Sequence, residues 1–283
     1  MADLIDIKPQ KPPGALLLPG LCGTPKELGS IPKVLEAAGY RIDVPMIPGY
    51  ADKAGPIDWH AWLDEVEARF ELLKKECETV AVIGLSMGSV LAMALAQRRN
   101  DIDGMVLLSP LLRYDGWATP WYHFLIRFVY AAGFRNWSWR EKYPYGIANA
   151  ELRRRVQKAV EQGEASEVGS AFISARHMDA AQSMMRITRT WLNHIQTPLL
   201  VIHAVDDETA APRNAEEILH RVSSEKRRVI WLGDSYHIIT VDNEREVVVN
   251  ETVRFVDECR SNTASRQGFR DRVTPLRLKD RRG

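Results

Sequence analysis

One serine in this chain lies in the run Gly84-Leu85-Ser86-Met87-Gly88, between an apolar run, Thr79–Ile83, and a helix-type run, Ser89–Ala96. A G-x-S-x-G sequence between a strand and a helix is typical of a nucleophile elbow, a sharp turn that presents the serine hydroxyl clear of the sheet. The two glycines leave this turn free of side chains that would collide. We therefore expect Ser86 to be a nucleophile.

A serine hydroxyl needs a general base and an acid that orients the base. His237 lies between the last predicted strand, Arg228–Leu232, and the last predicted helix, residues 242–260, from where it can reach Ser86. Its neutral imidazole would accept the serine proton, so activity should fall as the pH drops through the histidine pKa. His203 lies inside an apolar strand run and is expected to be a packed core residue.

The acid is less sharply defined by the residues themselves. Asp206 and Asp207 are adjacent at the end of the strand run 198–205, and Asp234 is close to His237 in sequence. Neighbouring side chains on a strand point in different directions, so only one of the first two can accept the Nδ1–H of the histidine. Either would complete the chain order serine, acid, histidine.

Acyl transfer also requires two backbone N–H groups aimed at the developing oxyanion. The N–H of Met87 follows the nucleophile and begins the next helix. The second donor is expected in the loop after the first strand, Ala15–Leu18, where Leu21 follows Gly20.

Strand-type and helix-type segments alternate along the chain, which predicts an α/β fold with a mostly parallel central sheet flanked by helices. One helix is expected over residues 25–38, capped by Thr24, and another after the capping residue Asp58. Residues 112–191 interrupt the alternation with a helix-type, aromatic-rich stretch that contains no clear apolar strand. We therefore expect a core of residues 14–111 and 192–260, an inserted helical cap of residues 112–191, and a basic, flexible tail of residues 261–283. The cap aromatics have three interpretations: the cap's own core, the lining of an acyl pocket, or a lipid-facing surface.

Composition narrows the class of protein further. The 283 residues carry a formal net charge of +1, which does not favour a nucleic-acid partner. The three cysteines, Cys22, Cys77 and Cys259, have neither disulfide nor metal-site spacing, which fits a reducing compartment. Catalysis through an acyl-enzyme on Ser86 would need no metal or cofactor. There is no leader-type N-terminus and no apolar run near the ~20 residues that span a bilayer, so we expect a cytoplasmic protein without stable membrane insertion. The oligomeric state is left open.

Four segments together resemble the α/β-hydrolase superfamily over residues 14–260, and most closely small bacterial carboxylesterases and monoacylglycerol lipases. They are Leu16–Thr24, Gly84–Gly88, His203–Glu208 and Ser235–Thr240. The family places its catalytic aspartate four residues after a histidine or its equivalent, so the resemblance favours Asp207 over Asp206. It also implies a small helical cap between the same two strands. Two residues depart from the family pattern: Pro19 replaces the usual histidine before Gly20, and Tyr236 replaces the usual glycine before His237.

The resulting functional hypothesis is a serine carboxylesterase that hydrolyses short- to medium-chain acyl esters, with monoacylglycerols among the candidate substrates, through an acyl-enzyme on Ser86. The alternatives are a thioesterase or acyltransferase, a C–C bond hydrolase on the same triad, or a ligand receptor with slow turnover. The serine at the elbow argues against dehalogenases and epoxide hydrolases, which use aspartate there.

Overall fold

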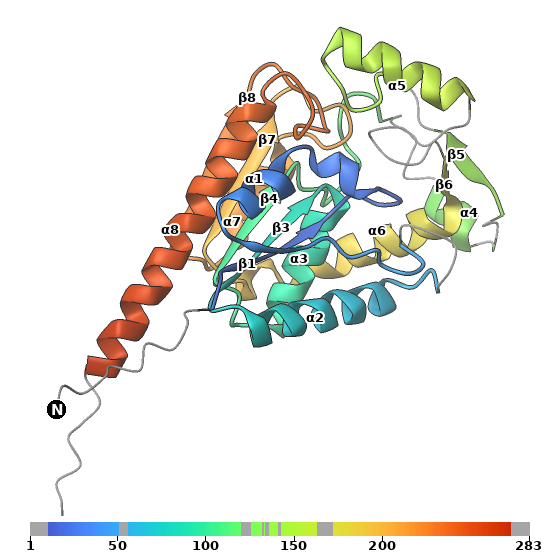
Figure 1. Ribbon diagram of the computed structural model, residues 1–283. Coiled ribbons are helices and arrows are strands. Elements are labelled where there is room, and N and C mark those ends of the chain that lie inside the picture. The colour runs from blue at the N-terminus through green and yellow to red at the C-terminus, as the bar shows by residue number, and fades with distance from the viewer. Residues whose placement is uncertain are drawn as a thin grey trace, which may run out of the picture.

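The computed structural model describes residues 11–50, 56–119, 126–131, 133, 136–140, 143–162 and 172–272. A six-stranded sheet in the order β2-β1-β3-β4-β7-β8 forms its centre, and every neighbouring pair is parallel (Figure 1). This confirms the predicted α/β fold. The strands are β1 (Gly14–Leu18), β2 (Arg41–Asp43), β3 (Val80–Leu85), β4 (Gly104–Leu108), β7 (Leu199–Ala204) and β8 (Arg227–Leu232).

The central strands are apolar on both faces because helices cover both sides of the sheet. Along β1, Leu16 and Leu18 pack into one core layer, whereas Ala15 and Leu17 pack into the other. The same alternation continues along β3, β4 and β7, as expected for side chains that repeat every two residues.

The helices divide between the two faces (Figure 1). One face is covered by α1 (Ile31–Ala37) and α8 (Arg245–Arg272), and the other by α2 (Trp59–Glu76), α3 (Met87–Arg98), α6 (Ala175–Thr190) and α7 (Arg213–Arg221). The predicted cap of α2 is confirmed, since the Asp58 side chain accepts a hydrogen bond from the His60 N–H at 3.1 Å.

The prediction of a single helix over residues 25–38 is wrong. A 3-10 helix, η1 (Pro25–Leu28), is separated from α1 by Gly29, whose φ is +58°, and the Thr24 side chain makes no capping hydrogen bond. A Cβ atom at residue 29 would collide with the backbone carbonyl of Thr240. The close approach of the segment that follows His237 therefore breaks this helix, and only glycine fits at the break.

Residues 112–191 lie between β4 and β7, as predicted, but they are not entirely helical. Besides α4 (Ile126–Ala131), α5 (Ala150–Gln162) and α6, they contain an antiparallel pair, β5 (Ser138–Arg140) and β6 (Phe172–Ser174). Strands of three residues are too short to produce a recognisable alternation in the sequence. The core side of α6 contributes Ala181, Met184 and Met185 to the main hydrophobic core. The division into core and cap stays a prediction, and four of the aromatics assigned to the cap, Trp121, Tyr122, Phe124 and Phe134, lie outside the described residues.

The last helix is longer than predicted, whereas the flexibility of residues 261–283 stays a prediction. The last helix, α8, ends at Arg272 rather than at Arg260, and residues 273–283 lie outside the described residues. The next proline is Pro275, so no residue before it removes a backbone donor from the helix. Within the extension, the Thr263 hydroxyl donates to Asp103 Oδ1 at 3.1 Å, and Asp103 directly precedes β4. A strongly polar helix extension carries no apolar period, which is why the sequence pattern did not indicate it.

No helix in the described ranges is long and apolar enough to cross a membrane. Within the same ranges, no cluster of three or more His, Cys, Asp or Glu side chains has the arrangement of a metal site.

The three cysteines are buried thiols, and burial raises the pKa of Cys259 from 9.0 to about 11. A thiol with a raised pKa stabilises the folded state below pH 9, and this contribution is lost as the pH rises towards 11. We expect the unfolding free energy to fall by up to ~3 kcal/mol over that interval through Cys259. Urea denaturation of the wild type and Cys259→Ala between pH 8 and 11 measures this. Parallel pH curves for the two proteins would contradict it.

Candidate active site

Ser86 occupies the sharp turn between β3 and α3, with φ 54° and ψ −114°. A Cβ atom at Gly84 would overlap the backbone of residues 88 and 89, and one at Gly88 would overlap the carbonyl of Leu18. Both glycines are therefore required by close backbone approach, as the sequence pattern predicted. The buried Ser89 hydroxyl donates to the carbonyls of Gly84 and Leu108 at 2.7 and 3.1 Å, which holds the turn against β4.

Two hydrogen bonds link Ser86, His237 and Asp207 in a line. His237 Nε2 lies 2.7 Å from Ser86 Oγ, and His237 Nδ1 lies 2.7 Å from Asp207 Oδ2. Ser86 follows β3, Asp207 follows β7 and His237 follows β8. Because these strands are parallel, their carboxyl ends lie at one edge of the sheet, which places the three residues together. This is the geometry in which a serine hydroxyl can lose its proton to an imidazole that a carboxylate orients.

The structure separates the three acid candidates. Asp207 is 2% exposed, and its second oxygen accepts the N–H groups of Thr209 and Ala210 at 2.9 and 2.8 Å. Asp206 is exposed, and its backbone carbonyl accepts the indole N–H of Trp117 at 3.1 Å. Asp234 is also exposed and accepts a hydrogen bond from the Asn243 amide. Only Asp207, among these three, contacts the His237 ring.

Electrostatics favour a charged Asp207. Burial alone opposes its ionisation, but the charge and hydrogen bond of His237 outweigh burial, so the pKa of Asp207 lies below its ordinary value. Burial acts in the same direction at the neighbouring Glu208, but there it is the larger effect and the pKa is raised. The core residue His203 is fully buried, donates from its Nε2–H to the Ala210 carbonyl at 2.9 Å, and has a pKa lowered by burial.

The loop that follows β1 lies against the serine. A Cβ atom on Gly20 would be 3.7 Å from Ser86 Cβ, and the Gly20 N–H donates to the buried Glu27 carboxylate at 3.1 Å. The Tyr50 hydroxyl donates to the Pro19 carbonyl at 2.8 Å. The N–H groups of Leu21 and Met87, the two predicted oxyanion donors, have no hydrogen-bond acceptor among the described residues.

Sequence reasoning missed the part that Glu208 plays in this site. Its side chain is 5% exposed, and Oε2 accepts the backbone N–H of His237 at 3.1 Å. The only sequence signal was its position in the acidic run Asp206-Asp207-Glu208. That run does not indicate which of the three side chains turns inward, because the turn after β7 decides it.

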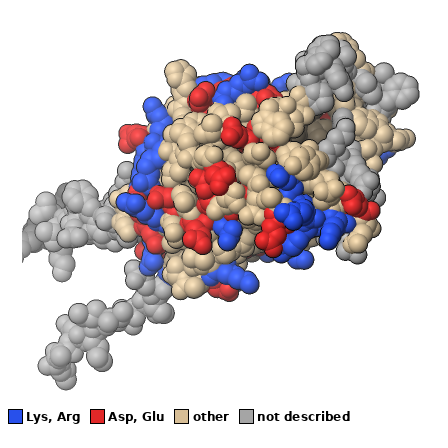
Figure 2. Space-filling view, turned by 90° about the horizontal axis from the view of Figure 1, so that it is seen from above, with Lys and Arg blue, Asp and Glu red and all other residues tan. Residues whose placement is uncertain are grey.

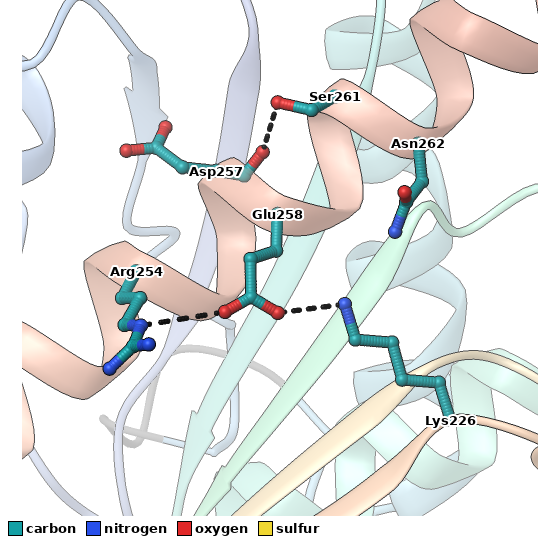
Figure 3. A pocket seen from close by; sticks show the side chains of 6 residues that line it. All are labelled: Lys226, Arg254, Asp257, Glu258, Ser261 and Asn262. Atoms are coloured by element: carbon teal, nitrogen blue, oxygen red, sulfur yellow. Dashed lines mark hydrogen bonds and ion pairs between the residues drawn. The ribbon is translucent and has the colours of Figure 1, made fainter.

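A surface hollow of about 720 Å³ lies elsewhere, between α8 and the start of β8 (Figure 3). Within it, Glu258 pairs with Lys226 at 2.9 Å and with Arg254 at 3.6 Å. Lys226 directly precedes β8, so this hollow is at the amino ends of the strands, whereas Ser86 and His237 follow strand carboxyl ends. We therefore assign it no part in the candidate site. The hollow is lined by Lys226, Arg254, Asp257, Glu258, Ser261 and Asn262.

Charged side chains of both signs are interspersed over the face seen from above in Figure 2. This distribution agrees with the near-zero net charge of +1.

Residues 53–245 match the family described as "Serine aminopeptidase, S33". The matched segment is more than two thirds of the chain and contains Ser86, Asp207 and His237. The chain belongs to this family. The predicted classification as a serine hydrolase with an α/β-hydrolase fold is thereby confirmed.

Curated relatives cover most of this S33 protein. It is 26% identical to a thermostable monoacylglycerol lipase of Bacillus sp. strain H-257, over 86% of this chain and 90% of the relative. It is 22% identical to a carboxylesterase of Bacillus subtilis strain 168, over 86% of this chain and 92% of the relative. The predicted resemblance to these two groups is therefore confirmed.

Solved structures agree on the fold. The crystal structure of the Paleococcus ferrophilus monoacylglycerol lipase superposes with a TM-score of 0.71 and 18% identity, covering 88% of this chain and 97% of that one. At 18% identity, this structural similarity supports the fold only.

Proposed function

We propose that this S33 protein is a serine carboxylesterase that hydrolyses short- to medium-chain acyl esters through an acyl-enzyme on Ser86. The observation that carries the proposal is the Ser86–His237–Asp207 line, with 2.7 Å at each hydrogen bond. The names of its relatives, a monoacylglycerol lipase and a carboxylesterase, support carboxylic esters as the substrate class.

In the first half-reaction, Ser86 Oγ attacks the ester carbonyl carbon while His237 Nε2 takes the hydroxyl proton. Asp207 accepts the Nδ1–H of the imidazole, which keeps Nε2 facing the serine and stabilises the imidazolium that forms. The carbonyl oxygen becomes negative and accepts hydrogen bonds from the N–H groups of Leu21 and Met87. His237 then protonates the leaving alcohol as the carbon–oxygen bond of the ester breaks.

In the second half-reaction, water takes the place of the alcohol. His237 removes one water proton, the hydroxide attacks the acyl carbon, and the proton passes to Ser86 Oγ as the acid leaves. Every group in this cycle is a side chain or backbone N–H of the chain itself, so the proposed cycle requires no cofactor.

Hydrolysis of a series of p-nitrophenyl esters, from acetyl to palmitoyl, tests the proposal directly. We expect turnover that peaks at a short or medium acyl chain and falls by ~10³–10⁶-fold in Ser86→Ala. Mass spectrometry of the protein quenched during turnover should show one acyl group on the peptide that contains Ser86. Turnover near the wild-type rate in Ser86→Ala, or acylation at another residue, would contradict the assignment of the nucleophile.

Parallel substrates separate the alternatives. A matched acyl thioester tests the thioesterase, an added alcohol acceptor tests the acyltransferase, and a vinylogous 1,5-diketone tests the C–C bond hydrolase. An aminoacyl p-nitroanilide tests the peptidase activity that the family description names. If kcat/KM is highest on one of these substrates, that substrate class replaces the carboxylic ester in the proposal. Binding without turnover would favour the ligand receptor.

A further inference from the structure

A fully buried aspartate, Asp242, lies five residues after His237 and outside the catalytic line. Its two oxygens accept four backbone N–H groups. Oδ2 accepts those of Ala148 at 2.7 Å and Tyr236 at 2.9 Å, and Oδ1 accepts those of Asn149 at 2.8 Å and Asn243 at 2.9 Å. One carboxylate therefore joins the segment that begins α5, in the inserted region, to the residue before the candidate general base.

Asp242 is one of three carboxylates that hold the loop of His237. Glu244 accepts the N–H groups of Gly233 and Asp234 at 3.2 and 2.8 Å, and Glu208 accepts the N–H of His237 at 3.1 Å. Between them, the Tyr236 N–H donates to Asp242. Buried or half-buried carboxyl oxygens that accept these successive N–H groups hold the loop, and with it the imidazole, in one position, because a shift would leave donors and acceptors unpaired.

Apolar packing reinforces the same junction. Ile147, Leu152, Val156 and Val160 form a small buried cluster, against which Ile238 and Val241 pack from the histidine loop. The N–H of Ile238 donates to the Gly146 carbonyl at 2.8 Å, and a Cβ atom on Gly146 would collide with the Ile238 side chain. The start of α5 and the histidine loop therefore lie in direct contact, at the upper right of the sheet in Figure 1.

We infer that Asp242 is a positioning residue for His237, and that it couples the start of α5 in the inserted region to the catalytic histidine. Asp242 touches no reacting atom in this scheme. Its carboxylate holds Tyr236 and residues 148–149 in one register, so a shift of α5 changes the position of the imidazole relative to Ser86. The inference rests on the proposed function, which assigns His237 as the general base.

The test compares wild type, Asp242→Asn and Asp103→Asn. Asp103 is a matched control: its carboxylate accepts the backbone N–H of Val80 at 2.7 Å, but it directly precedes β4 at the amino edge of the sheet. Asp242→Asn presents amide donors to N–H groups and should lower kcat on the best p-nitrophenyl ester by ~10- to 100-fold, because small misplacement of a catalytic group has effects of this size. KM should change much less, and Asp103→Asn should retain the wild-type kcat at temperatures where it is folded.

Amide hydrogen exchange provides the readout that a merely structural role would not produce. In Asp242→Asn, exchange should increase together at residues 146–149 and 233–238, with little change in β1 and β3. If Asp242→Asn does not fold, Asn149→Ala perturbs the junction from the α5 side, since Asn149 caps α5 through Leu152 at 2.9 Å and binds Asn243 at 2.8 Å. It should raise exchange at both segments and lower kcat to a smaller extent.

The outcomes distinguish this inference from the proposed function. Wild-type kcat in a folded Asp242→Asn, or increased exchange at residues 146–149 without any at 233–238, would overturn the coupling. A wild-type protein that hydrolyses no ester would remove the proposed function, while the exchange measurement would still report on the junction. In that case the rate at which a fluorophosphonate labels Ser86 replaces kcat, and an unchanged labelling rate in Asp242→Asn would overturn the positioning role.

Discussion

Replacing Ser86 by alanine is expected to reduce kcat by ~10³–10⁶-fold on the best ester, with residual activity from the oxyanion donors and substrate binding alone. The physical reason is the removal of the atom that forms the acyl-enzyme, Oγ, which lies 2.7 Å from His237 Nε2. Steady-state hydrolysis of the p-nitrophenyl series measures this loss. The melting temperature should change little, because alanine retains the Cβ that already tolerates φ 54° in this turn.

Ser109→Ala is the matched control for that variant. Ser109 follows the neighbouring strand β4, is fully buried and also has a positive φ, 43°. Its hydroxyl has no hydrogen-bond partner among the described residues, so its removal leaves no group unpaired. We expect Ser109→Ala to hydrolyse esters at close to the wild-type rate. Equal losses in the two variants would mean that the effect comes from the strained turns and not from a nucleophile.

Asp207→Asn is expected to lower kcat by ~10⁴-fold, whereas Asp206→Asn should have little effect. An asparagine amide at residue 207 can donate to His237 Nδ1, which would fix the tautomer with its proton on Nε2, facing Ser86. The neighbouring Asp206 is exposed and contributes only its backbone carbonyl to Trp117, which the substitution preserves. The comparison therefore makes the same chemical change at adjacent positions, and kcat/KM on one ester measures both.

The pH profile sharpens this comparison. His237 lowers the pKa of Asp207 although burial opposes this, so Asp207 should be ionised at neutral pH in the wild type. In Asp207→Asn the imidazole no longer has a carboxylate beside it, so the pH at which the residual activity reaches half its maximum should be lower than in the wild type. Equal losses in the 206 and 207 variants would reassign the acid.

Local patterns in the sequence were sufficient for the parallel sheet, the elbow and the chain order of the candidate triad. The strands of this sheet are apolar runs, because both faces are covered, and the elbow requires glycine at residues 84 and 88 for short-range steric reasons. His237 stood out by its place between the last strand and the last helix. Each of these signals arises from residues within a few positions of each other, which is the range over which sequence patterns report structure.

Contacts between distant segments decided the rest. The choice between Asp206 and Asp207 needed a family resemblance at the sequence level, and in the structure it follows from the turn after β7, which buries one side chain and exposes the other. Gly29 breaks a helix because Thr240 packs against it from more than two hundred residues away. The strands β5 and β6 exist by pairing with each other, and Asp242 joins residues 148–149 to 236 across the fold. The sequence determined which residues could do chemistry, whereas the tertiary structure determined which of them meet, because burial and carboxylate–amide pairing are set by segments that the chain brings together only on folding.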